Sequence, residues 1–311
     1  MESTFKDLGG EVRNLRRLID PDVKVWSAFN PSIGVSPAGK YAVTLRSSNY
    51  VILETGELNV TIGDKITNRA YFGELDNDLK ISNLTLVDFS ECSYTTKRGV
   101  EDLKLLWRDG GWKFTGVVLE RAHTPVARQC YGALDSLTGL VTESVIHPGV
   151  EAKKPEKNWM TPYKKSPNFD YIYGPSAIVK DDKVIHTMVD RKDFTGLRGN
   201  SHLHEMKDGT YLAVMHKLWS KEFPMYSPRH FCNVMAKDKD YFHYFVRFDE
   251  YGTLIEMSKP FQFISRGIEF AMGIVEKDDS YVISFGKNDA SSHLGIIKKT
   301  LVKKKLVSLK K

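Results

Sequence analysis

Two adjacent carboxylates, Glu101 and Asp102, open a stretch with the pattern of a strand, a tight turn and a second strand. A carboxyl group in a partly desolvated site can exchange a proton with a reacting oxygen, which is general acid–base catalysis. Asp109-Gly110-Gly111 supplies the turn, because glycine accepts positive φ without steric cost. Side chains alternate along a strand, so we expect the two carboxylates to point to opposite faces. Taken alone, the pair is more typical of a solvated strand entrance, and only the rest of the chain favours a catalytic role.

The composition is that of an ordinary globular protein. Of the 311 residues, 41% are hydrophobic and 27% are charged, which is enough to build a sizeable core. Lys and Arg number 45 against 39 Asp and Glu, and the net charge of +6 only weakly favours phosphates, nucleotides or nucleic acid. The first residues lack the pattern of a signal peptide, and no apolar run approaches the roughly 18 residues that cross a bilayer. We therefore expect no membrane partner and a cytoplasmic location.

Several common catalytic and cofactor motifs are missing. Gly9-Gly10 lacks the Lys-Ser/Thr ending of a phosphate-binding loop, and neither HExxH nor GxSxG occurs, which argues against zinc proteases and α/β-hydrolases. No Rossmann fingerprint is present, so the usual nucleotide-sugar transferase architecture is not expected. The cysteines Cys92, Cys130 and Cys232 are odd in number and lack CxxC spacing, which indicates neither a disulfide framework nor a zinc site. We expect no metal and no cofactor.

Short strands separated by turns make up almost the whole chain. Turn sequences such as Lys207-Asp208-Gly209 and Glu250-Tyr251-Gly252 recur about every ten residues, and one short helix is expected over residues 10–20. This density of turns favours a sandwich, a barrel or a propeller. Comparable strand groups begin near residues 25, 100, 170, 200 and 265. Five groups of up to four strands predict an all-β, five-bladed β-propeller whose inner strands line one channel, as a single domain over residues 1–311 with its core at about 25–300.

The order of polar motifs carries a resemblance to known enzymes. Asn30-Pro31-Ser32-Ile33 and Leu45-Arg46-Ser47-Ser48-Asn49-Tyr50 resemble the first blade of the five-bladed propellers around glycoside hydrolase family 130. That group includes the mannoside phosphorylases, and glycosyltransferase family 108 is related to it. The match covers about residues 25–300. It continues in order through Asn68-Arg69, Glu101-Asp102, Glu156-Lys157-Asn158-Trp159, Arg198-Gly199-Asn200-Ser201, Val214-Met215-His216-Lys217, His243, Gly267-Ile268-Glu269-Phe270 and Ser284-Phe285-Gly286-Lys287-Asn288-Asp289.

The resemblance implies a role for Asp102. The acid motif of the family is typically Glu-Asp-Pro-Arg, and its Asp is the single catalytic acid of an inverting reaction, acting in the phosphorylases through a sugar hydroxyl. Asp102 matches that residue, whereas Leu103 and Lys104 replace the Pro and Arg. This departure bears on substrate geometry more than on the acid itself.

Other motif positions are expected to bind substrate. Trp159, Tyr50 and Tyr163 are candidate sugar platforms, although aromatic residues in propellers more often pack between blades. The full set of substrate-binding candidates is Asn30, Arg46, Asn49, Tyr50, Glu101, Asn158, Trp159, Asn200, His243, Glu269 and Asp289.

Basic residues come from sequence regions assigned to four different blades. If they converge, they could hold a phosphate, or the phosphate of a sugar donor, by charge-assisted hydrogen bonds. Each alone is more typical of a surface cation, and the match to motif positions favours a binding role for Arg69, Lys157 and His216. His216 follows an apolar run and is expected to face inward, where it could also be a core histidine. The expected phosphate- or donor-binding residues are Arg69, Lys157, Arg198, His216 and Lys217, with Arg46 beside them.

Asn30 argues against simple hydrolysis. Furanosidase propellers of related fold place an Asp in the first blade, and hydrolysis with two carboxylates needs a base or nucleophile on the other face of the sugar. An amide cannot be that base. Glu269 or Asp289 could substitute, but each is more typical of a group that holds a turn or orients a sugar hydroxyl.

We therefore expect a glycosyl-transferring enzyme, a glycosyltransferase or a glycoside phosphorylase. Its donor would be a sugar phosphate or a nucleotide sugar, and its acceptor a glycan or a modified nucleic acid. The alternatives are a glycoside hydrolase of the same fold and a non-catalytic propeller that binds carbohydrate or nucleic acid. The C-terminal lysines are expected to form a basic, solubilising tail that could also contact a polyanion. They are Lys298, Lys299, Lys303, Lys304, Lys305, Lys310 and Lys311.

Overall fold

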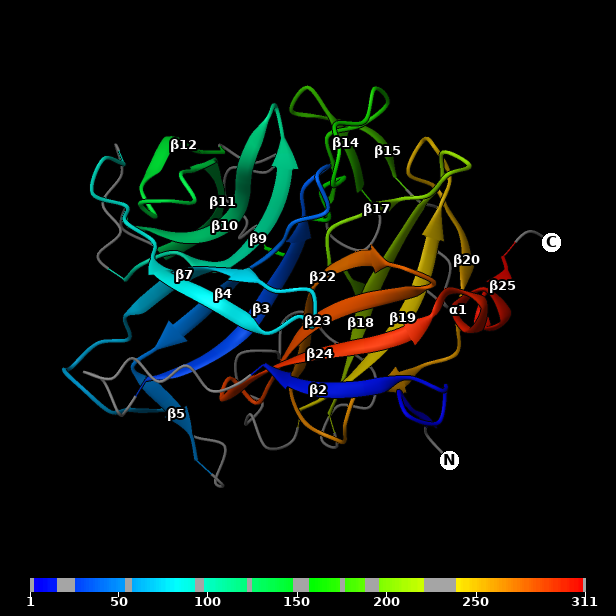
Figure 1. Cartoon of the computed structure of the whole chain (residues 1–311). Helices are drawn as coiled ribbons and strands as arrows, with labels where there is room; N and C mark the ends of the chain where they lie inside the picture. Colours follow the sequence, from blue (N-terminus) through cyan, green and yellow to red (C-terminus); the bar gives the residue numbers. More distant parts are fainter. Residues whose placement is uncertain are drawn as a thin grey trace.

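The computed structural model describes residues 3–15, 26–53, 58–92, 98–121, 125–147, 157–173, 177–187, 196–220 and 239–309. Within these residues the protein is all-β, and a single short helix, α1 (Lys299–Lys305), lies near the C-terminus (Figure 1). No helix in this part of the chain is long and apolar enough to cross a membrane. Glu156, Cys232, Lys310 and Lys311 lie outside the described residues.

The first two four-stranded sheets are antiparallel, and their strands lie side by side in the order in which they occur in the chain. The first sheet contains, side by side, β3 (Ser27–Val35), β4 (Tyr41–Ser48), β7 (Asn68–Leu75) and β8 (Ile81–Leu86). A separate hairpin is formed by β5 (Tyr50–Ile52) and β6 (Leu58–Val60). The second sheet contains β9 (Glu101–Arg108), β10 (Gly111–Arg121), β11 (Pro125–Leu134) and β12 (Val141–Ile146).

The remaining sheets complete the molecule. The third sheet contains β13 (Tyr171–Tyr173), β14 (Ala177–Lys180) and β15 (Lys183–Thr187). The fourth and largest runs through β16 (Leu197–Arg198), β18 (Tyr211–Ser220), β19 (Lys239–Phe248), β21 (Phe261–Gln262) and β1 (Ser3–Thr4), with β17 (His204–Glu205), β20 (Leu254–Met257) and β25 (Val307–Ser308) attached. The last contains β22 (Glu269–Lys277), β23 (Ser280–Lys287), β24 (Ser291–Lys298) and β2 (Glu11–Leu15). The strand groups expected near residues 25, 100, 170, 200 and 265 thus correspond to sheets that begin with β3, β9, β13, β16 and β22.

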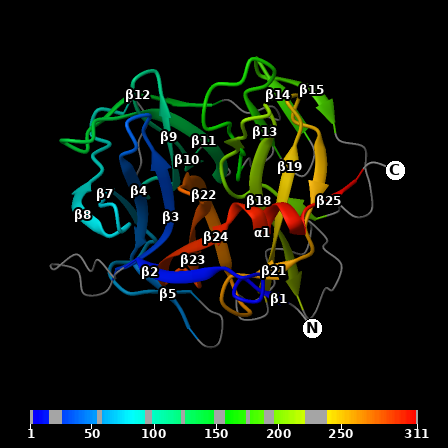
Figure 2. The ribbon, with the colours of Figure 1, turned by 45° about the vertical axis from the view of Figure 1, so that its right-hand side comes forward.

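The helix expected over residues 10–20 is wrong where the structure describes it. Glu11–Leu15 forms β2, which pairs antiparallel with β24 from Glu11 opposite Ile296 to Leu15 opposite Ser292. Figures 1 and 2 show β2 lying along β24. The unpaired edge of β24 offers a row of hydrogen-bonding groups, and pairing with it outweighs a weak local helix preference. The N-terminal part of the chain therefore completes the sheet formed by its C-terminal part.

Apolar clusters lie between most pairs of successive sheets. One cluster joins the first and second sheets, another the third and fourth, another the fourth and last, and another the last and first. Representative members of these clusters, in the same order, are Phe72 and Phe114, Ile172 and Met215, Val214 and Ile274, and Val282 and Ile33. Among the described residues no such cluster joins the second and third sheets, and a small group of Trp159, Tyr171 and Val179 lies on the third sheet.

The C-terminal lysines do not form a tail as far as Lys305. Lys298 ends β24 and pairs with Asp279, with Nζ to oxygen distances of 2.5 and 2.7 Å, and Lys299 pairs with Glu276 at 2.7 Å. Residues 299–305 form α1, and Val302 in this helix is buried. The apolar face of α1 packs on the cluster between the fourth and last sheets, and this burial holds the segment in place.

Candidate active site

β-bulges place two of the candidate residues. The register of β3 against β4 shifts between Phe29 and Ser32, and that of β9 against β10 shifts opposite Gly116. Asn30 and Asp102 lie in these bulges with φ of +47° and +52°, a left-handed conformation that Asn and Asp tolerate better than most residues. The bulges bring the two side chains together, and Asn30 Nδ2 donates a hydrogen bond to Asp102 Oδ1 at 2.9 Å.

Arg46 on β4 contacts both carboxylates. Its Nη1 lies 3.1 Å from Asp102 Oδ1, its Nη2 lies 3.4 Å from Glu101 Oε1, and its Nε donates to Asn68 Oδ1 at 2.9 Å. The side chain is buried, which disfavours its charge, but the two carboxylates outweigh this effect and raise the pKa of Arg46. Arg46 is therefore a fixed cation that orients the acidic pair.

The second oxygen of Asp102 is open. Asn30 and Arg46 both bind Oδ1 of this carboxylate, and within the described residues Oδ2 accepts no hydrogen bond. The side chain retains 17% exposure. A carboxyl group with one oxygen anchored and the other open can exchange a proton with a bound ligand.

The prediction that Glu101 and Asp102 face opposite sides is wrong. Both contact Arg46, because the bulge at Asp102 interrupts the alternation of side chains along β9. Glu101 Oε2 also lies 3.3 Å from the Nζ of Lys157. Burial would raise the pKa of Glu101, but Arg46 and Lys157 outweigh burial and lower it. Glu101 is therefore an ionised partner of two cations.

Two glycines allow the close packing of these strands. A Cβ on Gly99, whose φ is +74°, would lie 2.0 Å from the carbonyl oxygen of Asn68. A Cβ on Gly286 would lie 2.2 Å from Asn30 Oδ1. Any side chain at either position would push apart the backbones that carry the Asn30, Asp102 and Arg46 group.

Asp289 and Tyr50 form a second pair beside this group. Tyr50 Oη donates to Asp289 Oδ2 at 2.7 Å. Burial raises the pKa of Asp289 although Arg46 opposes the shift, and burial also raises the pKa of Tyr50. The interactions of Asp289 with Arg46, Asp102 and Glu101 place all four charged groups in one site.

Lys104 is a buried cation that the sequence reasoning did not assign to the site. Its Nζ donates to the carbonyl oxygen of Trp159 at 2.7 Å, and only 4% of the residue is exposed. Burial lowers its pKa to about 7, although Asp102 opposes the shift. Its position could have indicated a role in the site, because it lies two residues after Asp102, where the family motif has an Arg.

Arg198 and His216 lie around Tyr241. The ring of His216 stacks on that of Tyr241 at 4.8 Å with an interplanar angle of 2°. Burial lowers the pKa of His216 well below its usual value, with Arg198 and Lys104 adding to the shift. Burial likewise lowers the pKa of Arg198, and it raises that of Tyr241 to about 12, with contributions from Asp289 and Asp102 that Arg198 opposes. His216 is thus a neutral hydrogen-bonding group close to Lys104.

Glu269 is fully engaged in holding a turn. Its oxygens accept hydrogen bonds from the backbone N–H groups of Phe263 at 2.7 Å, Ile264 at 2.9 Å and Ser265 at 3.1 Å. Lys287 Nζ lies 3.3 Å from Oε1. His243 is completely buried 4.0 Å from this carboxylate, and burial lowers its pKa to about 3. A carboxylate bound in this way is not free to act as a base.

Two of the expected substrate-binding amides bind backbone instead. Asn49 Nδ2 donates to the carbonyl oxygens of Ile62 at 2.6 Å and Lys65 at 2.9 Å, and its Oδ1 accepts from the backbone of Thr67. Asn200 is completely buried, and its amide pairs with the backbone N–H and C=O of Ala271 at 3.1 and 2.8 Å. Both amides hold neighbouring segments together.

The aromatic candidates are packed against other groups. The rings of Trp159 and Tyr171 stack 3.5 Å apart, and both residues are buried. Tyr163 Oη accepts from the backbone N–H of Val35 at 2.6 Å and donates to its carbonyl oxygen at 2.8 Å. Asn158, with a φ of +63°, precedes Trp159 in the segment that carries Lys157.

Arg69 and Lys217 lie away from the Asp102 group. Arg69 on β7 lies opposite Ser47, the residue after Arg46 on β4. Its guanidinium lies 4.2 Å from the ring centroid of Trp26. Lys217 follows His216 on β18, and its Nζ lies 5.9 Å from the ring centroid of Tyr244. Because neighbouring strand residues face opposite sides, the expected basic cluster divides between two faces of these sheets.

Comparison with known proteins gives a match in structure. No protein-family model matches the sequence, and no curated protein matches it. A β-1,2-mannobiose phosphorylase from Listeria innocua is 11% identical, with a TM-score of 0.61 over 92% of this chain and 94% of that one. MPT-4, a mannose phosphorylase from Leishmania mexicana, is 11% identical, with a TM-score of 0.59 over 96% and 92%. MPT-1, a GDP-Man-dependent mannosyltransferase from the same organism, is 14% identical, with a TM-score of 0.57 over 93% and 90%.

The chain has the fold of the mannoside phosphorylases. The same comparison includes a structure described under the GH130 family of mannoside phosphorylases, which contains glycoside hydrolases that target β-1,2 mannosidic linkages; it is 14% identical, with a TM-score of 0.63 over 94% of each chain. The resemblance drawn from the order of the motifs is therefore confirmed at the level of the fold. One fold supports several chemistries, so the reaction has to be argued from the Asp102 site itself.

Proposed function

We propose that this protein is a five-bladed β-propeller enzyme that transfers a glycosyl unit, with Asp102 as its acid/base. The blade arrangement is supported by the order of the sheets, by the apolar clusters that join successive sheets, and by β2, which completes the last sheet. The observation that carries the chemistry is the Asp102 carboxylate, whose Oδ1 is held by Asn30 and Arg46 while Oδ2 stays open.

The proposed reaction is a single displacement. An acceptor hydroxyl attacks the anomeric carbon as the phosphate-bearing group leaves, and the proton of that hydroxyl passes to Asp102 Oδ2. In the reverse direction phosphate attacks, and Asp102 returns the proton to the glycosidic oxygen. The resemblance to the phosphorylases adds a sugar hydroxyl as the relay for this proton.

Cations beside the carboxylate favour a donor that carries phosphate. Lys157, Arg198 and, in its protonated form, Lys104 would bind the phosphate oxygens, with His216 as a neutral hydrogen-bond donor. Arg46 has a different role, because its guanidinium is already engaged by two carboxylates. The acceptor would be a glycan or a modified nucleic acid.

Hydrolysis is less well supported. Glu269 is bound by three backbone N–H groups and Lys287, so its oxygens are already occupied and are not free to contact a water molecule. Asp289 remains, but the Tyr50 hydroxyl occupies one of its oxygens. Neither residue is well placed to be the second catalytic carboxylate that hydrolysis needs.

The test is incubation with sugar 1-phosphates and nucleotide sugars, beginning with mannose 1-phosphate and GDP-mannose, together with mannose or mannobiose as acceptor. We expect consumption of a donor and formation of a new glycoside, both followed by chromatography. Release of free sugar from glycosides, independent of phosphate, would identify a hydrolase instead. Ligand binding without turnover of any donor would identify a binding protein.

A further inference from the structure

A cavity lies at the far end of the strands that carry the Asp102 site. β9 carries Asp102 near its start and reaches this cavity of about 660 Å³ with Arg108 at its end. β3 likewise carries Asn30 near its start and reaches the cavity with Val35. Asp102 and Arg108 are six positions apart, which is about 20 Å of extended chain. The volume falls within the range of about 300–1,000 Å³ that ligand pockets occupy, so the cavity is a candidate binding site separate from Asp102.

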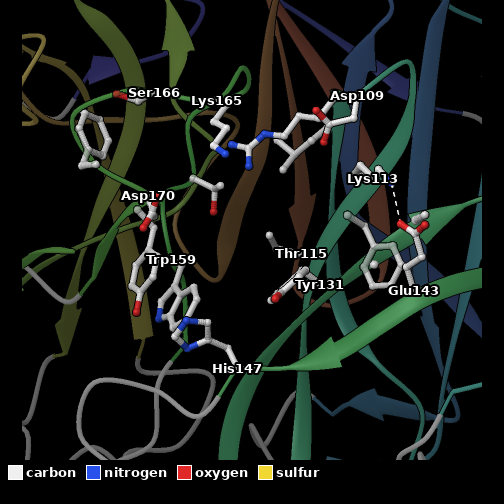
Figure 3. A pocket seen from close by; sticks show the side chains of 18 of the residues that line it. Asp109, Lys113, Thr115, Tyr131, Glu143, His147, Trp159, Lys165, Ser166 and Asp170 are labelled. Atoms are coloured by element: carbon white, nitrogen blue, oxygen red, sulfur yellow. Dashed lines mark hydrogen bonds and ion pairs between the residues drawn. The ribbon is translucent and has the colours of Figure 1, made fainter. Parts of the chain in front are cut away.

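The cavity adjoins another, which lies between the second and third sheets and is drawn in Figure 3. Arg108, Asp109 and Lys165 line both cavities, and Figure 3 shows Lys165 and Asp109 on opposite sides of the upper part of the space. Most carboxylates of the neighbouring cavity are paired with other basic groups and do not neutralise Lys165. The pairs are Glu143 with Lys113 at 3.1 Å, Asp170 with Lys180 at 3.2 Å, and Asp182 with His147 at 2.6 Å.

Among the described residues, three carboxylates line the cavity at the strand ends, and two of them are matched by basic groups of the protein. Glu276 lies 3.2 Å from His204 Nε2 and 2.7 Å from Lys299 Nζ, and these two contacts lower its pKa to about 2. Glu205 lies 3.8 Å from the Nζ of Lys164. Neither carboxylate therefore presents an unmatched charge that would repel an anion.

Two lysines that line this cavity are left without a carboxylate. Lys165 and Lys207 are exposed, and neither makes an ion pair within the described residues. The third carboxylate, Asp109, directly follows Arg108 and offsets the charge of that residue. The balance of charge around the cavity is therefore positive, which favours an anionic ligand.

An apolar surface accompanies this charge. Trp107 and Val35 line the cavity, and both are partly exposed. The ring of Trp107 packs in a T-shaped arrangement against that of Trp112, with centroids 4.9 Å apart and an interplanar angle of 89°, and this contact fixes its orientation. An aromatic ring that is held in place and partly exposed suits contact with another planar ring. Inorganic phosphate would leave this apolar surface in water, whereas a ring would cover it.

We propose that this cavity is a second binding site, separate from the Asp102 site, and that it binds a small organic anion that carries a planar ring, the chemistry of a nucleoside monophosphate. Lys165 and Lys207 would bind the anionic group, and the ring would pack against Trp107 and Val35. A neutral ring would leave the two lysines unmatched. The proposal does not depend on the reaction at Asp102.

The test measures binding of AMP to the full chain by calorimetry at low ionic strength. Adenosine, which lacks the charge, and inorganic phosphate, which lacks the ring, are the comparison probes. AMP should bind about tenfold or more tightly than either. Lys165→Gln and Lys207→Gln should each weaken AMP binding by about two- to tenfold, the effect of one lost hydrogen bond, and leave adenosine binding unchanged. Because neither lysine has an ion-pair partner, the melting temperature should not change.

Trp107→Leu tests the apolar half of the site. This substitution should weaken the binding of AMP and adenosine alike, because both carry the ring. The matched control for the lysines is Lys259→Gln. Lys259 is also exposed and makes no ion pair within the described residues, but it does not line the cavity, so its replacement should leave AMP binding unchanged.

Four outcomes would overturn the proposal. The first is the absence of AMP binding, and the second is AMP binding no tighter than that of inorganic phosphate. The third is an equal loss of affinity in Lys259→Gln and in the two cavity variants, which would indicate attraction by the overall charge. The fourth is AMP binding that Lys157→Gln weakens and that Lys165→Gln and Lys207→Gln leave unchanged, because such binding belongs to the Asp102 site.

Discussion

Asp102→Asn tests the proposed reaction most directly. The amide keeps the size of the side chain, and its oxygen can still accept from Asn30 Nδ2 and Arg46 Nη1, as Oδ1 does now. What is lost is the ability of the second position to exchange a proton. Arg46 also loses one of its two carboxylate partners but keeps Glu101 at 3.4 Å.

The expected magnitude follows from this division of roles. General acid–base catalysis contributes about 10²–10⁴-fold, which corresponds to roughly 3–5 kcal/mol of barrier. Turnover of the donor should fall by that factor, whereas the melting temperature and the affinity for donor should change little. The assay is the rate of glycoside formation at saturating donor, with donor affinity measured separately by calorimetry.

Glu101→Gln is the matched control. Glu101 contacts the same arginine and also Lys157, but neither of its oxygens has the open position of Asp102 Oδ2. We expect this change to alter donor affinity or stability more than the rate of proton transfer. Full turnover in Asp102→Asn together with a loss in Glu101→Gln would reassign the acid to Glu101. Full turnover in both variants would remove the acid from β9 altogether.

Further substitutions test how the site is held together. Gly99→Ala should destabilise the fold by about 1–3 kcal/mol more than the control Gly110→Ala. The two glycines have similar φ values, +74° and +76°, but only at Gly99 would the added Cβ meet a backbone carbonyl oxygen. Equal losses of stability in urea unfolding would contradict this expectation. Arg46→Met leaves two carboxylates without their buried cation and should lower the free energy of unfolding by about 3–5 kcal/mol. The control Arg13→Met, at an exposed ion pair, should lower it by no more than about 1 kcal/mol. Similar losses for the two variants would show that Arg46 does not hold the two carboxylates. Burial lowers the pKa of Lys104 to about 7, so between pH 7 and about 10.5 the unfolded chain binds the proton that the folded chain has lost, and stability should rise with pH over this range. Lys104→Met should flatten that rise in thermal unfolding measured against pH, and a rise of unchanged slope would refute the assignment.

The strands could be predicted because their signals are local. The turn at Asp109-Gly110-Gly111 needs glycine at positive φ, and the flanking residues show strand character without reference to any distant segment. The same holds for the turns at Gly209 and Gly252, whose φ values are +81° and +84°. Candidate catalytic and binding residues at the starts of such strands could also be proposed, because the strand starts are marked by these local turn signals.

Features that depend on a distant partner could not be predicted. Glu11–Leu15 becomes a strand only because β24 presents an open edge. Glu101 and Asp102 point to the same side because the pairing of β9 with β10 shifts register at Asp102. The rule that side chains alternate along a strand does not predict such a shift. Glu269 was expected to hold a turn rather than act as a base, but the three N–H groups that it binds, at residues 263–265, could not be named from the sequence.

The position of the acid depends on the packing of two sheets against each other. Asn30 and Asp102 each hold a left-handed conformation, which costs on the order of 1 kcal/mol or more for a residue with a side chain. Neither strand stabilises its own bulge at that position. The stabilisation comes from the hydrogen bond between the two side chains and from Arg46, which binds across from β4. If the first two sheets move apart, the orientation of Asp102 is lost while the strands themselves persist, so activity should be lost before the fold.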